Sequence, residues 1–253
     1  MDNDNKAVGI GTALLIVAIG AGLYFYKFAS PPPAPAASPA VQPPAAAPET
    51  APSAALPKLE ESDGFVRGKA AALSSNPAFA SWLKTDDLVA RFAAAVSLIG
   101  QGRVPKDGLS FLAPHKKFPV RKTGETVMLD PRGYARYDAA AAAVGSIDAA
   151  AAARLFLEIK PLLQQAYLGL GEKNGDVQDA FARAAGVLLK TPSVEGKIAL
   201  KEKGIVYAYM DDSLESLSPA QKQLLRMGPK NVALIQDKLR EFETALGASS
   251  LRR

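Results

Sequence analysis

Residues 7–26 carry no charge, and this stretch constrains the chain more than any other. A helix of this length, rising about 1.5 Å per residue, is roughly 30 Å long, which matches the hydrocarbon core of a bilayer. Lys6 and Lys27 flank the stretch, where their ammonium groups can reach the membrane interface. A cleaved signal peptide has a shorter apolar core, and a buried core helix is rarely followed at once by prolines. We therefore predict a transmembrane helix over residues 7–28, embedded in a lipid bilayer.

Proline and alanine dominate residues 29–57. Between Ser30 and Pro57, ten of 28 residues are proline and Glu49 is the one charged residue. Because proline fixes φ and lacks an N–H, this segment can form neither a long helix nor a strand ladder. In polyproline II geometry it would span roughly 85 Å. We predict a disordered linker, which serves either as a semi-rigid stalk for a folded domain or as an unselected spacer.

Residues that open or cap helices recur through residues 58–247, which we predict to be one mainly helical domain. These residues are Ser62, Asn76, Thr85, Asp130, Asp176 and Ser218, the last of which begins a capping box. A single long helix is predicted from Ser146 to about Leu170. Pro161 lies inside it and should kink it near Leu157, whose carbonyl the proline ring would meet.

Two short segments have the pattern of β-hairpins. Residues 118–130 place apolar residues on both sides of a turn at Gly124, and residues 198–210 do the same around Gly204. The two segments could pair in one small sheet. The predicted fold class is therefore a mainly α domain with one or two small β-hairpins, followed by a tail over residues 248–253.

Cysteine is absent and histidine occurs once, as His115. This composition excludes disulfides, thiolate nucleophiles, iron–sulfur clusters and cysteine-ligated zinc, and also zinc sites that need two imidazoles. His115 lies between prolines and beside two lysines, so we interpret it as an exposed loop residue. The sequence has no GxSxG nucleophile motif. We expect no metal site, no cofactor and no catalytic residue.

Three pairs of adjacent carboxylates remain as candidates for acid–base chemistry: Asp86-Asp87, Asp211-Asp212 and Glu60-Glu61. The first two lie where helices are expected to begin, and helix capping explains them without catalysis. A glycosidase could still be assembled from carboxylates that are distant in the sequence.

A basic segment over residues 103–122 is the first candidate binding site. It holds six basic residues and one acidic residue, Asp107. The basic residues are Arg103, Lys106, Lys116, Lys117, Arg121 and Lys122. Such a patch can attract anionic headgroups, glycan carboxylates or an acidic protein. A solvated loop that keeps the domain soluble is the alternative. We do not expect nucleic acid as a partner, because the domain is predicted to be tethered to a membrane.

The sequence GYARYDA at residues 133–139 marks the second candidate site. On an α-helix, Arg132 and Arg136 would lie one turn apart, beside tyrosines that include Tyr137. Two such arginines can bind a carboxylate or a phosphate. They can equally form structural bridges between helices, which is the interpretation we favour.

Four separated motifs carry a resemblance to a known family. They are SPAQKQLLRMGPKN at 218–231, LPKLEESDGFV at 56–66, FLAPHKKFPVR at 111–121 and GYARYDA at 133–139. The sequence resembles an uncharacterised bacterial family, one of the domains of unknown function, over roughly Leu56 to Gly247. Members look like single-pass envelope proteins with a proline-rich linker and a helical domain. The resemblance implies topology and compartment but no reaction.

These observations predict a protein of the bacterial inner membrane with a tail over residues 1–6, favoured to be cytoplasmic, and a periplasmic C-terminal domain. The charges on either side of residues 7–28 are nearly balanced, so the orientation rests on the linker, which resembles an extracytoplasmic spacer. The expected function is an interaction or scaffold module whose partner is an envelope protein or an anionic envelope component. The alternatives are a hydrolase of an envelope polymer acting through carboxylates, and an anion- or lipid-binding module using residues 103–122.

Overall fold

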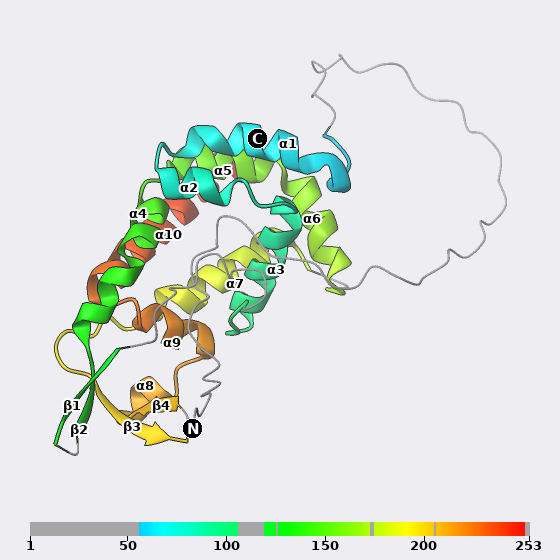
Figure 1. The fold of residues 1–253 in the computed structure, drawn as a ribbon. Helices are drawn as coiled ribbons and strands as arrows, with labels where there is room; N and C mark the ends of the chain where they lie inside the picture. The colour runs from blue at the N-terminus through cyan, green and yellow to red at the C-terminus, as the bar shows by residue number, and fades with distance from the viewer. Residues whose placement is uncertain (1–55, 106–118, 125, 173–174, 205, 251–253) are drawn as a thin grey trace, which may run out of the picture.

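The computed structural model describes residues 56–105, 119–124, 126–172, 175–204 and 206–250 (Figure 1). The predicted transmembrane helix at 7–28 and nearly all of the predicted linker lie outside these residues.

Within the described ranges, no single helix is both long and apolar enough to cross a bilayer. One consecutive pair, Pro131–Gly145 with Ala149–Glu158, passes by length and composition but is bent by 67°.

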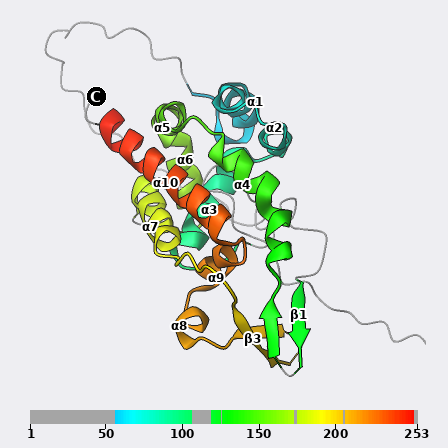
Figure 2. The same ribbon diagram turned by 90° about the vertical axis from the view of Figure 1, so that its left-hand side faces the viewer.

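The described chain forms a mainly helical domain with a small antiparallel sheet, as predicted. The α-helices are α1 (Ser62–Ala70), α2 (Pro77–Trp82), α3 (Leu88–Gly100), α4 (Asp138–Gly145), α5 (Ala149–Glu158), α6 (Lys160–Gly169), α7 (Val177–Leu189), α8 (Asp212–Glu215), α9 (Pro219–Leu225) and α10 (Pro229–Ser250). The 3₁₀ helices are η1 (Leu59–Glu61), η2 (Ala71–Leu73) and η4 (Pro131–Tyr137), and the strands are β1 (Val120–Thr123), β2 (Thr126–Leu129), β3 (Ala199–Lys203) and β4 (Val206–Tyr209). Figure 2 shows the sheet and α8 at one end of the molecule, with α9 between them and the other helices.

The sheet confirms both predicted hairpins and their pairing. Its order is β1-β2-β3-β4, with every neighbouring pair antiparallel. Gly124 and Gly204 take positive φ values of 60° and 61° in the two turns, a conformation that glycine adopts without strain. Strands β2 and β3 join the hairpins through Val127, opposite Leu200, and the next residue pair. The inner face of the sheet packs on α8 and α9 and forms a second apolar cluster.

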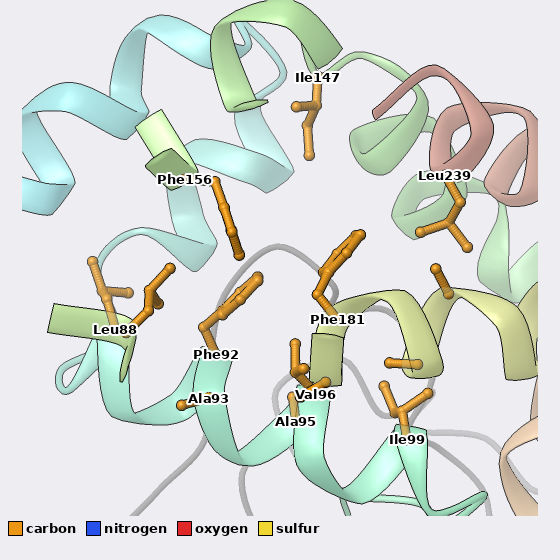
Figure 3. Packing of buried hydrophobic residues seen from close by; sticks show 14 of the residues in the cluster. Leu88, Phe92, Ala93, Ala95, Val96, Ile99, Ile147, Phe156, Phe181 and Leu239 are labelled. Atoms are coloured by element: carbon orange, nitrogen blue, oxygen red, sulfur yellow. The ribbon is translucent and has the colours of Figure 1, made fainter. Parts of the chain in front are cut away.

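Four phenylalanines from four helices form the centre of the helical core. Phe92 of α3, Phe156 of α5, Phe181 of α7 and Phe242 of α10 lie with ring centroids 4.9–6.4 Å apart in each contacting pair. Figure 3 shows three of these rings, those of Phe92, Phe156 and Phe181, converging from their helices. Such aromatic pairs contribute about 0.5–1.5 kcal/mol each beyond the burial of their area. They therefore hold the long central helices against one another.

Local capping signals were confirmed at several helix starts. Asn76, Asp130, Asp176 and Ser218 each accept a hydrogen bond from a backbone N–H of the helix that follows, and Ser218 forms the predicted capping box with Gln221. Ser62 is not a cap. It is the first residue of α1, and its hydroxyl donates to the carbonyl of Leu59 at 2.7 Å.

The predicted cap of α3 was also wrong. Thr85 does not cap this helix, which begins at Leu88 after Asp87 in a left-handed conformation with φ 59°. The cap comes instead from α1, where Asp63 accepts hydrogen bonds from the backbone N–H groups of Asp87 at 2.6 Å and Leu88 at 2.8 Å. A carboxylate distant in sequence thus takes the place of a local side chain, and it ties α1 to the start of α3.

The long helix predicted around Pro161 is broken rather than kinked. Helix α5 ends at Glu158, Ile159 leaves the helical conformation (φ −94°, ψ 8°), and α6 begins at Lys160. Pro161 then occupies the first turn of α6, where its missing N–H needs no partner. Inside a continuous helix, its ring would have met the preceding turn.

Replacing Asp63 by alanine should lower the free energy of unfolding by about 1–2 kcal/mol, because two backbone N–H groups at the start of α3 lose their acceptor. Urea unfolding followed by circular dichroism measures the change. Asp86→Ala is the matched control, since the Asp86 side chain is 88% exposed and lies 3.8 Å from Arg67. It should change stability by less than about 0.5 kcal/mol. Equal stability of the two variants would contradict the capping role of Asp63.

Candidate ligand-binding site

An apolar cavity of about 110 Å³ lies between α1, α2, α3, α5 and α10. Its walls include Val66 of α1, Phe79 of α2, Phe92 of α3 and Phe156 of α5. In Figure 3, Phe92, Phe156, Ile147 and Leu239, all cavity-lining residues, point from separate elements toward one interior region.

The cavity is large for a core of this kind. Protein interiors are close-packed, with few voids larger than a water molecule. Its walls offer water few hydrogen-bond partners, because they are almost entirely apolar. The cavity opens in part toward the surface, so an apolar ligand could enter it and bury its apolar walls.

The edge of the cavity is polar. Ala149 and Lys238 line both the cavity and a shallow surface groove between the start of α5 and the second half of α10. Among the described residues that line the cavity, Lys238 is the one with a charge. Its side chain is 17% exposed, and its ammonium pairs with Glu241 one turn further along α10. An aliphatic stem on the apolar side and a charged head at the surface is the usual arrangement for a lysine at such a boundary.

Two further charged groups flank this groove. Arg240 pairs with Asp237 at 2.7 Å. Asp148 caps α5 by accepting a hydrogen bond from the backbone N–H of Ala151 at 2.9 Å, and this bond lowers the pKa of Asp148. The cavity therefore has apolar walls and a mouth with fixed charges.

The basic segment predicted as a binding site is only partly described. Lys106, Lys116 and Lys117 lie outside the described residues, as does His115. Arg103 is exposed, with Nη1 3.5 Å from Oε1 of Gln101.

Lys122 at the tip of the first hairpin pairs with Glu202 of β3 at 2.7 Å. The hydrogen bond and the charge of Glu202 raise the pKa of Lys122. Its positive charge is thus offset locally.

Arg121 and Arg132 meet at a carboxylate that sequence reasoning treated only as a helix cap. Asp130 is 2% exposed, and Nε of Arg132 donates to both of its oxygens at 3.0 and 3.1 Å. Nη2 of Arg121 lies 3.8 Å from Asp130. The side-chain and backbone hydrogen bonds from Arg132 lower the pKa of Asp130 to about 2. Both guanidinium groups stay largely exposed, at 60% and 80% of their side chains.

The predicted pairing of Arg132 with Arg136 was wrong, because residues 131–137 form a 3₁₀ helix instead of an α-helix. With three residues per turn, positions four apart do not share a face. Nη2 of Arg136 donates to the hydroxyl of the buried Tyr137 at 3.0 Å, and its guanidinium lies 4.8 Å from the centre of that ring. Both contacts are with the neighbouring residue of the same 3₁₀ helix, whereas the structural role that we favoured for GYARYDA was a bridge between helices.

Comparison with known proteins identifies the domain. Residues 88–243 match the family described as Protein of unknown function (DUF3014). The chain belongs to this family. No curated protein and no solved structure matches it. Its membership confirms the resemblance to a domain of unknown function and leaves the single-pass envelope topology as a proposal.

Three carboxylates of the DUF3014 domain, those of Asp176, Asp211 and Glu215, are held by hydrogen bonds. Burial acts to raise the pKa of Asp176 and Glu215, but hydrogen bonds and the nearby Lys160 and Lys222 outweigh it, so both values are lowered. Hydrogen bonds from Ser213 lower the pKa of Asp211, which caps α8 as predicted.

Sequence reasoning missed the cavity and the buried Asp130 cluster for different reasons. The residues that line the cavity are spread along the chain from Val66 to Phe242. No local sequence pattern predicts how completely their side chains fill the space between them. The Asp130 cluster had a local signal, because the sequence DPR places Arg132 two residues after a helix-opening carboxylate.

The Asp130 cluster should make the DUF3014 domain sensitive to acid. A carboxyl group whose pKa falls from 3.8 to about 2 on folding adds stability that is complete above the unfolded value and is lost as the pH falls through the folded one. The difference in unfolding free energy between the protein and its Asp130→Asn variant should therefore shrink from about pH 5 to about pH 2. Urea unfolding across this pH range measures it.

Asp237→Asn serves as the control, since its exposed carboxylate pairs with Arg240 on the surface of α10. A difference for Asp130→Asn that stays constant with pH would show that the carboxylate is not held in its ionised form.

Proposed function

We propose that this DUF3014 protein is a single-pass protein of the bacterial inner membrane whose domain binds another component of the cell envelope. Residues 7–28 anchor it, residues 29–57 hold the domain on the periplasmic side, and the domain acts as an interaction module. The observation that carries the binding role is the apolar cavity with its charged mouth. Pockets of this kind, mostly apolar with a few placed polar groups, are the usual form of ligand sites.

The start of the domain supports a short connection to the linker. Leu56, which lies within the predicted linker, and Leu59, which follows it, both pack against the helical core. Few residues therefore separate the predicted stalk from the folded domain. A stalk of up to roughly 85 Å leaves the cavity and groove free to meet a partner well away from the lipid surface.

A second candidate is an anion- or lipid-binding role for residues 103–122. It is favoured by the exposed guanidinium group of Arg121, which lies beside that of Arg132 at the base of the sheet. Asp130 offsets one of these two charges, and Glu202 offsets Lys122. The described part of the segment is thus less basic than its composition indicates, so we rank this role below the cavity.

The tether and its orientation can be tested by labelling, since the chain has no cysteine of its own. Single-cysteine variants Asn3→Cys and Lys190→Cys place one thiol in the N-terminal tail and one on the exposed end of α7. In spheroplasts, a membrane-impermeant maleimide should label Lys190→Cys, whereas Asn3→Cys should react only after permeabilisation. Deleting residues 7–28 should move the chain to the soluble fraction. Labelling of Asn3→Cys in intact spheroplasts would show that the N-terminal tail is periplasmic and would contradict the proposed orientation.

A partner at the groove can be tested by photocrosslinking in cells. A photoreactive residue at Thr244, exposed on the groove wall, should give a discrete product with an envelope component. The same residue at Glu202, exposed at the tip of the sheet, is the control and should not give that product. The same product from both positions, or none from either, would contradict a groove-specific partner. Turnover of an envelope polymer by the purified protein would favour the hydrolase instead.

A further inference from the structure

We propose that the apolar cavity binds the methyl end of a single aliphatic chain, and that Lys238 in the adjoining groove binds the carboxylate at its other end. The ligand class is a fatty acid or a fatty-acid-like amphiphile. The proposal deepens the proposed function by naming a ligand. It rests on the domain being a binding module and does not depend on the membrane tether.

The walls of the cavity select an apolar ligand. Apart from Lys238, every described residue that lines the cavity is apolar. A cavity of about 150 Å³ with walls of this kind binds benzene or xenon and excludes water. The present cavity, of about 110 Å³, is smaller, so it holds the end of one slender chain. A sterol or the two chains of a phospholipid would not fit inside.

The shared wall of the cavity and the groove gives such a chain a way out. Ala149 at the start of α5 and Lys238 on α10 belong to both. Ala149 contributes a methyl group to this shared boundary, and Lys238 contributes an aliphatic stem. A chain longer than the cavity therefore leaves it between these two residues and enters the groove.

In the groove, the head group of the ligand would lie close to a positively charged side chain. The Lys238 ammonium lies at the boundary, and its three donors allow it to bind a ligand carboxylate while it keeps its contact with Glu241. Arg240, from the same helix, also lines the groove and is paired with Asp237 at 2.7 Å. The carboxylates that line the groove are Glu241, which is paired with Lys238, and Asp148, which accepts the backbone N–H of Ala151 and also interacts with the charge of Lys238. A carboxylate is thus the head group that the groove binds with a charge-assisted hydrogen bond.

Photolabelling of the full-length protein tests both halves of the proposal. The probes are dodecanoic acid with a diazirine near its methyl end, the matching dodecanol, and a phosphatidylcholine that carries the same diazirine chain. The protein is held in nanodiscs if it sediments with membranes, and in buffer if it does not. Mass spectrometry of the peptides locates the label. We expect dodecanoic acid to label peptides from α5 and α10, at residues 149–159 and 235–242.

Two substitutions separate the cavity from the charge. Ala152→Leu fills the cavity and should reduce labelling of these peptides by either single-chain probe to background. Ala151→Leu is its control, since the neighbouring alanine lines neither the cavity nor the groove. Lys238→Met keeps an apolar stem without the charge and should weaken labelling by the acid about tenfold, with little change for the alcohol. Lys230→Met, on the exposed first turn of α10, is the control for this substitution.

The outcomes decide the proposal. Label spread evenly over the domain, or unchanged labelling in Ala152→Leu, would overturn the cavity site. Equal effects of Lys238→Met on the acid and the alcohol would overturn the carboxylate site. Labelling of the cavity peptides by the phosphatidylcholine probe alone would replace the fatty acid with a lipid chain and overturn the proposed ligand class. Circular dichroism checks the fold of each variant, and if Ala152→Leu does not fold, the position of the label in the unsubstituted protein decides the cavity site.

The labelling of the cavity peptides can be interpreted even if the protein is not membrane-bound. Labelling of residues 7–28 is scored on separate peptides, so loss of membrane association and loss of the cavity site are distinguishable.

Discussion

The contacts among four phenylalanine rings are the interaction on which the rest of this domain depends. Phe92, Phe156, Phe181 and Phe242 come from the four helices that cross at its centre, and their rings set how closely those helices approach. The rings are rigid and planar, whereas much of the surrounding surface of α4 and α5 is alanine. The cavity lies beside these rings, because Phe92, Phe156 and Phe242 form part of its wall. The short side chains of Ala149 and Ala152 form another part of that wall.

The parts of the fold that could be predicted from the sequence are those decided by residues close together in the chain. The turns at Gly124 and Gly204 and the caps at Asn76, Asp176 and Ser218 depend on backbone conformation and on hydrogen bonds over two or three residues. The mainly helical class followed from the same local signals. Pairing of the two hairpins was predictable because each one alone has an apolar face to bury.

The parts that escaped prediction depend on distant residues or on finer choices of geometry. Asp63 caps α3 from another helix, so nothing near Thr85 reported it. The chain broke at Ile159 because two separate helices satisfy Pro161 better than one bent helix. For the candidate site, the basic residues were visible in the sequence, but their pairing with buried or cross-strand carboxylates was not. The cavity is a property of packing and has no sequence motif.

The cap on α3 has a consequence for what counts as a complete DUF3014 domain. The family match begins at Leu88, the first residue of α3. Asp63, whose carboxylate caps the start of this helix, precedes that residue, and so does the wall of the cavity that α1 and α2 form. A fragment trimmed to residues 88–243 would lack Val66, Phe79 and Trp82, which are buried in the same core, and would lack the carboxylate of Asp63 at the start of α3. The autonomous folding unit is therefore longer at its amino end than the stretch by which family members are recognised.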